Sequence, residues 1–500
     1  MKAVVTRSEM KRIDTYTIEK LGIPSLVLME RAAWSMVQRM LPYLDMSKSI
    51  LCVCGSGNNG GDAAAVARIL YGMGYNSAIF MAGSSEKWTE ETRKQIEIAR
   101  NIGVPEYNEL NLNIFHVVVD GLFGIGLSSP VREPYNKMIF QINQWKKQHS
   151  YAVVWSVDLP SGLSSDTGQI LGEAVHADFT VTFGYMKRGM ILYPGRELSG
   201  QCFVEDIGFP GKAIAANPVN GFYMDSNDLN KLPKRKQDSN KGDYGKILVV
   251  AGSKIMSGAA FFVAKSAYTM GSGLVRILTA EANRMILQTQ LPQAMISVWE
   301  EMTDDTLQNI IDWADALIIG PGIGTEKIME KRIENLLPLI KCPIVIDADG
   351  LNLLALNEMW YDKLNTQIVL TPHMGEMSRL TGKRISDLKK DRAFEAEEYS
   401  LRHHVVCALK DSSTVVSDGD RLCFNQTGNH GMATGGSGDV LSGIIGALLG
   451  MKMNPFDAAC LGVYIHGCAG DIAAKQYGTF SMTSVEIIEG LIKILKEIEN

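Results

Sequence analysis

Residues 49–74 read SILCVCGSGNNGGDAAAVARILYGMG, an apolar strand pattern followed by a glycine turn and an alanine-rich helical run. Similar strand patterns recur through the first half of the chain, with helical patterns in most of the intervals, at 49–55, 76–83, 116–122, 151–160, 179–184 and 201–208. Such alternation is typical of βαβ units, whose strands form mainly parallel sheets. The first half is therefore predicted to be an α/β domain.

A second alternating series begins at KILVVAGS (246–253) and continues to the helical segment GDVLSGIIGALLGM (438–451). Between the two series lies a polar stretch rich in Asn, Asp and Ser that includes the basic run KLPKRK (231–236). We place the seam near residues 210–222 and expect two α/β domains, 1–215 and 222–500. A chain of 500 residues has room for both, since domains average roughly 150 residues.

The composition argues against several classes of protein. A net charge of -6, with KLPKRK as the only basic run, does not fit a nucleic-acid coat. The longest nearly uncharged apolar stretch, 441–451, is shorter than the ~20 residues of a membrane-spanning helix. Charges from Lys2 onward leave no room for a secretory signal, so we expect a cytoplasmic chain that contacts neither nucleic acid nor membrane. The eight cysteines form no CxxC pair and are predicted to be reduced core residues.

The segment 19–40 has the pattern of an amphipathic helix. Its apolar face has two possible partners, a second subunit or the sheet of its own domain. We expect the chain to form a homo-oligomer, and the sequence leaves open whether this helix takes part.

The glycine turn at 55–62 predicts an anion site in the first domain. Gly55, Gly57 and Gly60 satisfy GxGxxG, and glycines let backbone N–H groups approach a phosphate at the start of a helix. The alternative is a tight strand-to-helix turn that binds nothing. A dehydrogenase would also need an acidic residue at the end of the next strand. The strand NSAIFMAG (76–83) ends without one.

Two more polar turns follow predicted strands of the first domain. They are DGLFGIGLSSPVREPYN (120–136), which begins with Asp120, and SVDLPSGLSSDTG (156–168), which contains Asp158. Either aspartate could simply cap the next helix. Three polar turns at the carboxyl ends of strands in one sheet nevertheless favour a ligand site, because ligands of open α/β sheets bind at that edge.

The three turns together resemble the signature loops of the NAD(P)H-hydrate epimerase family, over nearly all of residues 1–210. The resemblance implies a Rossmann-like three-layer sandwich that interconverts the two configurations at C6 of a hydrated nicotinamide ring. It implies a potassium ion held by Asn59, Asp120 and Ser161, oxygen ligands that suit a hard cation. Asp158 is the candidate acid and base, because inverting a carbon that bears a hydroxyl requires proton transfer. Hydrated NADH or NADPH would be bound by Asp158 and by Asn58, Asn59, Gly60, Gly61, Asp62, Gly124, Ile125, Gly126, Leu127, Ser128, Ser129, Pro130 and Tyr135.

The segment GNHGMATGGSGDVLSGIIGALLG (428–450) carries the strongest signal in the second domain. Gly435, Gly436 and Gly438 expose successive backbone N–H groups where a helix begins, which forms a concavity for a phosphoryl group. Asp439 follows and can accept the proton of a substrate hydroxyl while phosphate is transferred. The alternative is a glycine-rich helix start with Asp439 as a favourable first-turn residue. The sequence contains no GxxxxGK[ST], which excludes a Walker-type site.

Other predicted strands end in polar turns that would lie at the same edge. His373 follows one of them and Lys410 another, although each could be an ordinary solvated side chain. Asp347 and Asp349 follow a third, either near a magnesium-bound phosphate or as caps of the next turn.

The second half resembles the ribokinase-like fold and, within it, the ADP/ATP-dependent NAD(P)H-hydrate dehydratases. The motifs GPGIG, TPHMGEM, KDSSTVV and GNHGMATGGSGD occur in that family's order, and the resemblance covers nearly all of residues 225–500. It implies a three-layer α/β domain that uses ADP or ATP as phosphoryl donor with Mg²⁺. The hydrated cofactor would contact Ala259, Gly322, His373 and Asp439, and the nucleotide would lie against Gly438 and along Lys410, Asp411, Ser412, Ser413 and Thr414.

The combined resemblance implies a bifunctional repair enzyme, an epimerase followed by a nucleotide-driven dehydratase of the S-hydrate. Phosphorylating the C6 hydroxyl would turn a poor leaving group into a good one. The alternative is a ribokinase-like small-molecule kinase, of a vitamin or a sugar, fused to a nucleotide-binding domain. The sequence leaves open the choice of ADP or ATP and of NADH hydrate or NADPH hydrate.

Overall fold

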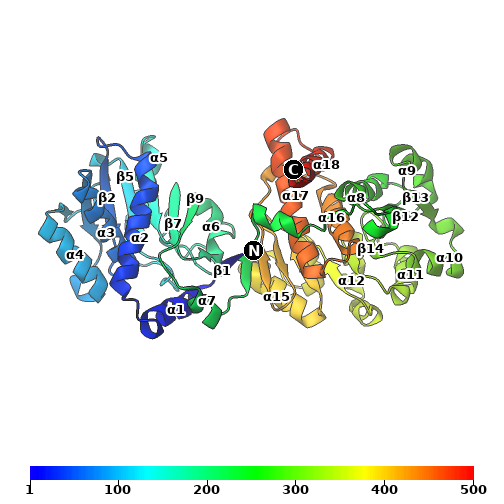
Figure 1. Ribbon diagram of the computed structural model, residues 1–500, viewed down its shortest axis with the longest axis horizontal. Coiled ribbons are helices and arrows are strands. Elements are labelled where there is room, and N and C mark those ends of the chain that lie inside the picture. Colours follow the sequence, from blue (N-terminus) through cyan, green and yellow to red (C-terminus); the bar gives the residue numbers. More distant parts are fainter. Residues whose placement is uncertain (500) are drawn as a thin grey trace. The chain divides into compact units, whose positions relative to one another are not determined.

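The computed structural model describes residues 1–499, which divide into two compact units (Figure 1). The first unit comprises residues 3–221. The second begins at Phe222 and includes Met1 and Lys2. Both units are α/β, as the alternating patterns predict.

The first unit is built on a parallel sheet in the order β4-β3-β2-β5-β6-β7-β9. All six strands predicted in this half are present. The sheet strands are β2 (Ser49–Cys54), β3 (Asn76–Met81), β4 (Glu106–Tyr107), β5 (Val117–Gly121), β6 (Val153–Val157), β7 (Phe179–Phe183) and β9 (Gln201–Glu205). Two short strands, β1 (Lys2–Val5) and β8 (Met186–Lys187), pair in parallel at Val4 and Val5.

Helices cover both faces of this sheet. Ile50 and Cys52 of β2 point to one face and pack with α2, α3 and α4. Leu51 and Val53 point to the other face and pack with α5. Side chains of β2 therefore point alternately to the two faces of the sheet, and helices cover both faces, so the unit has three layers. The helices are α1 (Arg7–Thr15), α2 (Ser25–Met40), α3 (Asn58–Gly72), α4 (Glu90–Ile102), α5 (Tyr135–Gln148), α6 (Gly195–Leu198) and α7 (Gly211–Ala216).

Helix α2 corresponds to the amphipathic pattern at 19–40, whose apolar face could pack on its own sheet or on a second subunit. Leu28, Ala32 and Met36 are buried in the core of their own unit. Leu26 and Trp34 remain exposed. The apolar stripe thus packs on its own sheet, and the expected homo-oligomer stays a prediction.

The second unit contains a mixed sheet, in which the strands from β11 to β19 are ordered β13-β12-β11-β14-β15-β16-β17-β18-β19. The pairs from β13 to β17 are parallel, as predicted, but β17-β18-β19 is antiparallel. The strands β13, β18 and β19 were not predicted from the sequence. The strands are β10 (Gly221–Tyr223), β11 (Lys246–Val250), β12 (Leu274–Thr279), β13 (Met295–Val298), β14 (Ala316–Ile319), β15 (Ile344–Ile346), β16 (Ile368–Leu370), β17 (Val406–Leu409), β18 (Val415–Ser417) and β19 (Leu422–Phe424).

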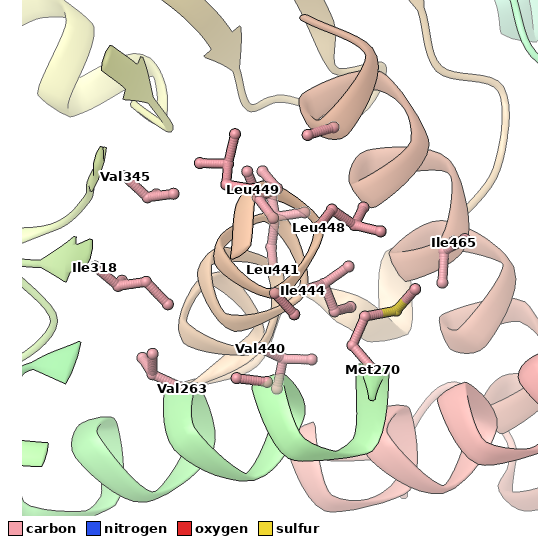
Figure 2. Close-up of a cluster of buried hydrophobic side chains, with 14 of the residues drawn as sticks. Val263, Met270, Ile318, Val345, Val440, Leu441, Ile444, Leu448, Leu449 and Ile465 are labelled. Carbon is pink, nitrogen blue, oxygen red and sulfur yellow. The ribbon is translucent and has the colours of Figure 1, made fainter. Parts of the chain in front are cut away.

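The core of the second unit forms around α16, the helix that follows the glycine turn. Figure 2 shows α16 between Ile318 and Val345 of the sheet, Val263 of α8 and Ile465 of α17. The helix is apolar on all sides, and such a helix is stable only when other elements surround it. The helices are α8 (Ser257–Met270), α9 (Arg284–Gln290), α10 (Asp304–Asp312), α11 (Lys327–Leu336), α12 (Asp349–Leu356), α13 (Met374–Thr381), α14 (Ile385–Leu388), α15 (Arg392–His403), α16 (Ser437–Gly450), α17 (Pro455–Tyr477) and α18 (Ser484–Glu499).

Gly443 allows α8 and α16 to pack closely. A Cβ at Gly443 would lie 2.3 Å from the carbonyl oxygen of Val263 and 2.0 Å from Ser266 Oγ. We expect Gly443→Ala to lower the free energy of unfolding by about 1–3 kcal/mol, because the two helices must move apart. Urea denaturation followed by circular dichroism measures this loss. Gly258→Ala in α8 is the matched control, since its Cβ would make only an ordinary contact with Phe262. Equal stability of the two variants would contradict the prediction.

Two further predictions concern the whole chain. Among residues 1–499, no helix combines the length and apolar character needed to cross a membrane. All eight cysteines are free thiols, and most of them are buried, as expected for reduced core residues.

Candidate functional site

The glycine turn before α16 leaves backbone N–H groups available at the start of the helix. Gly436 is the N-cap residue of α16, has φ 87°, and provides no side-chain hydrogen bond to the first turn. A Cβ at Gly436 would lie 2.8 Å from the ring of Phe262, so both conformation and space require glycine. Ser484 Oγ donates to the carbonyl oxygen of Gly435 at 2.7 Å and fixes the turn from behind. Free N–H groups and the helix dipole favour an anion at this position.

A buried ion pair lies beside this turn. Lys410 Nζ donates to Asp347 Oδ1 at 2.9 Å, and Ser442 Oγ donates to Asp347 Oδ2 at 2.6 Å. A Cβ at Gly438 would lie 3.3 Å from Lys410 Nζ. The ammonium group of Lys410 therefore faces the same corner as the N–H groups, and both can donate hydrogen bonds to a phosphate there.

Asp439 lies in the first turn of α16, next to this ion pair, and is half-buried. Burial, followed by the charge of Asp347, raises the pKa of Asp439 to about 7, against the lowering effect of Lys410. A carboxylate with such a pKa can exchange a proton near neutral pH, which is what a general base requires. A residue that served only the helix dipole would not need this environment.

His373 caps α13 at the end of the neighbouring strand β16. Its Nδ1 accepts hydrogen bonds from the backbone N–H groups of Gly375 and Glu376 at 2.9 and 3.3 Å. The side chain of Glu376 accepts from the backbone N–H of His373 at 2.8 Å. Burial and the nearby charges of Lys410 and Arg379 lower the pKa of His373, so the ring is neutral at physiological pH. His373 is therefore a structural cap, and its ring is half-exposed, with Nε2 3.3 Å from Glu376 Oε1.

Gly322, in the loop that follows β14, lies against Ala259 in the first turn of α8 and against Met256 in the loop that precedes this helix. Gly322 has φ 64°, and a Cβ there would lie 2.9 Å from the Cβ of Ala259 and 3.0 Å from that of Met256. Any larger residue at Gly322 would push the two loops apart. The two predicted contacts of the hydrated cofactor are thus direct neighbours.

The segment Lys410–Thr414 has more than one role. The carboxylate of Asp411 is bound by Arg392 of α15 at 2.6 Å, so it anchors the strand end. The backbone carbonyl of Thr414 accepts from Asn425 at 2.9 Å, which continues the antiparallel extension. Ser413 is buried and Ser412 is exposed. Within this segment, Lys410 lies beside the glycine turn, where its Nζ would be 3.3 Å from a Cβ at Gly438.

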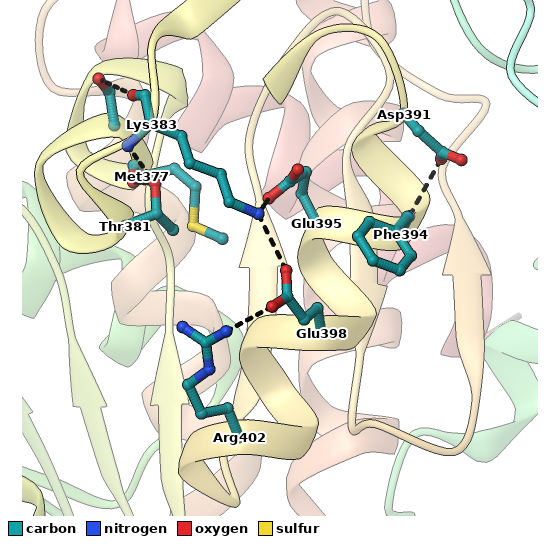
Figure 3. A network of polar contacts seen from close by, with 9 residues as sticks. Met377, Thr381, Lys383, Asp391, Phe394, Glu395, Glu398 and Arg402 are labelled. Carbon is teal, nitrogen blue, oxygen red and sulfur yellow. Dashed lines mark hydrogen bonds and ion pairs between the residues drawn. The ribbon is translucent and has the colours of Figure 1, made fainter. Parts of the chain in front are cut away.

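Helix α15, which carries Arg392, is itself held by a network of charges. Figure 3 shows Lys383 reaching Glu395 and Glu398 of α15, at 2.7 and 2.9 Å. Glu398 also bonds to Arg402 one turn further along. This network lies outside the candidate site and acts on it only by fixing the helix that binds Asp411.

Sequence reasoning left Asp347 with two interpretations and missed Glu376 and Ser442. Asp347 is the buried partner of Lys410, whereas Asp349 accepts from the N–H of Gly324 at 2.9 Å and so caps a turn. Ser442 could have been found, because it lies three residues after Asp439 and so on the same helix face. Glu376 could have been recognised as the third helical residue of a capping box.

In the first unit, the glycines of the turn at 55–62 have a packing role. A Cβ at Gly55 would lie 2.0 Å from the carbonyl oxygen of Leu122, and one at Gly60 would lie 1.9 Å from that of Gly55. These glycines allow the turn after β2 to approach the turn after β5. Gly57, the N-cap of α3, faces open space and leaves the start of the helix without a side-chain cap. The turn therefore combines close packing with an open helix start.

The three residues predicted to hold potassium lie where the turn after β2 comes close to the turn after β5. Asp120 is fully buried and accepts from the N–H and the hydroxyl of Ser161 at 2.9 and 2.6 Å and from Ser156 Oγ at 2.9 Å. Burial raises the pKa of Asp120, against the lowering effect of these hydrogen bonds. A Cβ at Gly124 would lie 2.9 Å from Asn59 Oδ1, and Asn59 Nδ2 is buried with no hydrogen-bond partner among residues 1–499. The structure brings Asn59 and the Asp120–Ser161 pair to the same turn.

The loop at 124–130 is largely open. Gly126 faces open space, and Ser128, Ser129 and Pro130 are exposed. The hydroxyl of Tyr135, at the start of α5, lies beside Gly83, where a Cβ would come within 2.3 Å of it. Ile125 and Leu127 pack against two different apolar clusters, and these contacts hold the loop in place. Tyr135 and the loop therefore lie at the carboxyl end of the sheet, with polar groups accessible.

Asp158 occupies the most constrained position of the first unit. Its φ is 63°, in the left-handed region that residues other than glycine rarely adopt. Its carboxylate accepts from Thr182 Oγ1 at 3.0 Å and from Lys187 Nζ at 2.5 Å. Strained residues of this kind persist where their surroundings hold them, commonly at functional sites.

Metal-binding residues of other kinds are not grouped anywhere in the described chain. Among residues 1–499, no three or more His, Cys, Asp or Glu residues are arranged to hold a metal ion. The oxygen set of Asn59, Asp120 and Ser161 contains a single residue of these four types.

Known proteins resemble this chain along its whole length. The family model described as NAD(P)H-hydrate dehydratase matches residues 247–493, and that described as YjeF-related protein N-terminus matches residues 25–189. A bifunctional NAD(P)H-hydrate repair enzyme of Thermofilum pendens is 37% identical over 98% of this chain and 95% of its own length. The protein of the same name from Escherichia coli is 34% identical over 97% of this chain and 93% of its own.

Two solved structures resemble the second unit. A ribokinase-like superfamily protein of Enterococcus faecalis has a TM-score of 0.52 and 26% identity, over 56% of this chain and 96% of that one. An ADP/ATP-dependent NAD(P)H-hydrate dehydratase of Bacillus subtilis, co-crystallised with ATP and Mg²⁺, has a TM-score of 0.50 and 29% identity, over 56% and 98%. These similarities confirm the ribokinase-like fold expected for this part of the chain.

Proposed function

Because this chain belongs to the family of bifunctional NAD(P)H-hydrate repair enzymes, we propose that its two units carry the two activities separately. Residues 1–215 would form the epimerase domain and residues 222–500 the dehydratase domain. The two family matches, at 25–189 and 247–493, support this division. The chain is an NAD(P)H-hydrate epimerase and a nucleotide-dependent NAD(P)H-hydrate dehydratase.

In the dehydratase, Asp439 is the proposed general base. It takes the proton of the C6 hydroxyl, whose oxygen then attacks the terminal phosphoryl group of ADP or ATP. The N–H groups at Gly435, Gly436 and Gly438 bind the transferring phosphoryl together with Lys410. The lone pair of the ring nitrogen expels phosphate, and loss of a proton from the adjacent ring carbon restores NADH or NADPH. The observation that carries this proposal is the position of Asp439 in the first turn of α16, at a helix start without a side-chain cap and next to the Lys410–Asp347 pair, and the pKa of Asp439, raised to about 7, agrees with it.

Magnesium would act at the same corner by neutralising phosphate charge. The carboxylates available are Asp347 and Asp439, but Asp347 already accepts from Lys410 and Ser442. A magnesium ion would therefore be held mainly by the oxygens of the nucleotide. The Bacillus subtilis protein was crystallised with ATP and Mg²⁺, which supports this proposal.

In the epimerase, Asp158 is the proposed acid and base at C6 of the hydrated ring. The open start of α3 at Asn58–Asp62, the loop at 124–130 and Tyr135 would bind the hydrated cofactor. A potassium ion suits the oxygens of Asn59, Asp120 and Ser161 and would supply a fixed positive charge between the two turns. The buried carboxylate of Asp120 supports this, because a buried negative charge favours a cation nearby.

Incubation with hydrated NADH and either ADP or ATP tests the dehydratase. We expect reduced-nicotinamide absorbance and inorganic phosphate to appear together in equal amounts. The kinase alternative predicts a phosphorylated product with no phosphate release. The same assay shows which nucleotide is the donor. A cytoplasmic location and a homo-oligomeric state remain predictions that this experiment does not address.

The pKa of Asp439 predicts the pH dependence of dehydration. Asp439 must be ionised to act as a base, so turnover should be low below about pH 7, where Asp439 is protonated. Turnover should rise as the pH increases through about 7. Turnover measured at saturating substrate between about pH 5.5 and 8.5 gives the pH at which turnover is half of its maximum. Circular dichroism of the same chain across this pH range is the control for general pH effects on the fold. A dehydratase profile that is flat through neutrality would contradict the assignment of Asp439.

A further inference from the structure

Lys187 is a buried cation in the first unit that the proposed mechanism does not use. Its side chain is 1% exposed, and it is among the largest fully buried side chains of the chain. A buried charge is costly unless it is paired and hydrogen-bonded. Lys187 Nζ donates to Asp158 Oδ1 at 2.5 Å, to Thr182 Oγ1 at 2.7 Å and to the carbonyl oxygen of Phe183 at 2.9 Å. All three donors of the ammonium group are therefore used.

These contacts hold only one oxygen of Asp158. Its Oδ1 accepts from Lys187 Nζ, from Thr182 Oγ1 at 3.0 Å and from the backbone N–H of Phe183 at 3.2 Å. In the part of the chain that the structure describes, no hydrogen bond reaches Oδ2. The carboxylate is thus anchored at one oxygen and open at the other, on a residue whose backbone is already strained.

Further carboxylates surround this pair. Burial raises the pKa of Asp62 in α3 well above its ordinary value, and the charges of Asp158 and Asp14 add to this effect. Burial likewise raises the pKa of Asp14 in α1, with contributions from Asp158 and Glu91. The charge of Lys187 acts against both shifts. Without this cation, repulsion among the carboxylates would favour proton uptake.

We propose that Lys187 is a positioning residue of the epimerase reaction, which anchors Asp158 Oδ1 so that Oδ2 faces the hydrated ring. The inference rests on the proposed role of Asp158. A purely structural ion pair would make a different prediction, since its loss would change stability but not the pH at which the enzyme becomes active.

The variant Lys187→Met tests the inference by removing the charge and retaining most of the volume. Interconversion of the R and S hydrates is followed by NMR on the full chain without ADP or ATP, so that dehydration does not occur. We expect kcat at neutral pH to fall about 10- to 100-fold with little change in KM, because the carboxylate loses its anchor. We also expect the acidic limb of the pH profile to move up by about 1 to 3 pH units, because removing a cation from this cluster of carboxylates favours proton uptake. An unmoved limb with an unchanged kcat would overturn the inference.

Two other variants complete the experiment. Lys146→Met removes a lysine that is paired with Asp178 at 2.8 Å elsewhere in the same unit. This variant should change neither kcat nor the position of the acidic limb of the pH profile. Thr182→Val keeps both charges but removes the hydroxyl that bonds to Lys187 and Asp158. We expect kcat to fall about tenfold, while the acidic limb of the pH profile stays at the same pH. If circular dichroism shows that Lys187→Met does not fold, Thr182→Val decides alone, and an unchanged kcat would refute the anchoring role.

The wild-type chain separates this inference from the proposed function. A wild-type chain that does not interconvert the hydrates would refute the epimerase assignment itself. An active wild type, together with a Lys187→Met variant that matches it at every pH, would refute only the role of Lys187.

Discussion

Replacing Asp439 by asparagine is expected to lower the turnover of dehydration by about 10²- to 10⁴-fold, the usual contribution of a general base. The amide has nearly the same shape as the carboxylate but cannot take the C6 hydroxyl proton. Nucleotide affinity should be retained, because the N–H groups of the glycine turn and Lys410 remain in place. Turnover is measured as the release of phosphate with hydrated NADH, and affinity by calorimetric titration with ADP or ATP.

Asp457 provides the matched control for Asp439. It occupies the first turn of α17 as Asp439 occupies that of α16. If Asp439 served only the helix dipole, both Asp→Asn variants would lose about 0.3–1 kcal/mol of stability and keep full turnover. Turnover lost in Asp439→Asn alone supports the base assignment. Normal turnover in that variant would remove Asp439 from the reaction.

Replacing Asp158 by asparagine is expected to slow the interconversion of the two hydrates by about 10²- to 10⁴-fold. The amide oxygen can still accept from Lys187, Thr182 and the N–H of Phe183, so the loop should keep its conformation. The S-hydrate should still be dehydrated at the wild-type rate. Starting from the pure R-hydrate with nucleotide present, the variant should therefore form NADH only very slowly.

Asp166 is the control in the same loop. It accepts from the backbone N–H of Arg7 at 2.6 Å and so has a structural contact of its own. Asp166→Asn should lose some stability and retain epimerisation at the assay temperature. If Asp158→Asn interconverted the hydrates at the wild-type rate with unchanged affinity, the proton carrier would have to be another residue.

Much of this architecture could be predicted from the sequence because it depends on local patterns. Continuous apolar runs such as ILCVC and ILVVA correspond to β2 and β11, since strands buried on both faces need no polar alternation. The strands β18 and β19 were missed because they follow β17 as antiparallel strands with no helix between them, which breaks the strand–helix alternation on which the prediction depended. The glycine motifs indicated both candidate sites, but the close backbone contacts of Gly55 and Gly60 are visible only in the folded chain.

The sequence by itself determined the α/β class, the two-part organisation and the positions of Asp158 and Asp439 at strand and helix ends, because periodicity and turn chemistry are encoded within a few residues. Only the tertiary structure decided which charges meet. Lys187 reaches Asp158 across 29 residues, and Lys410 reaches Asp347 across 63. Such pairs form because parallel strands bring their carboxyl ends to one edge of a sheet, and the depth of burial there determines which carboxylate keeps its proton.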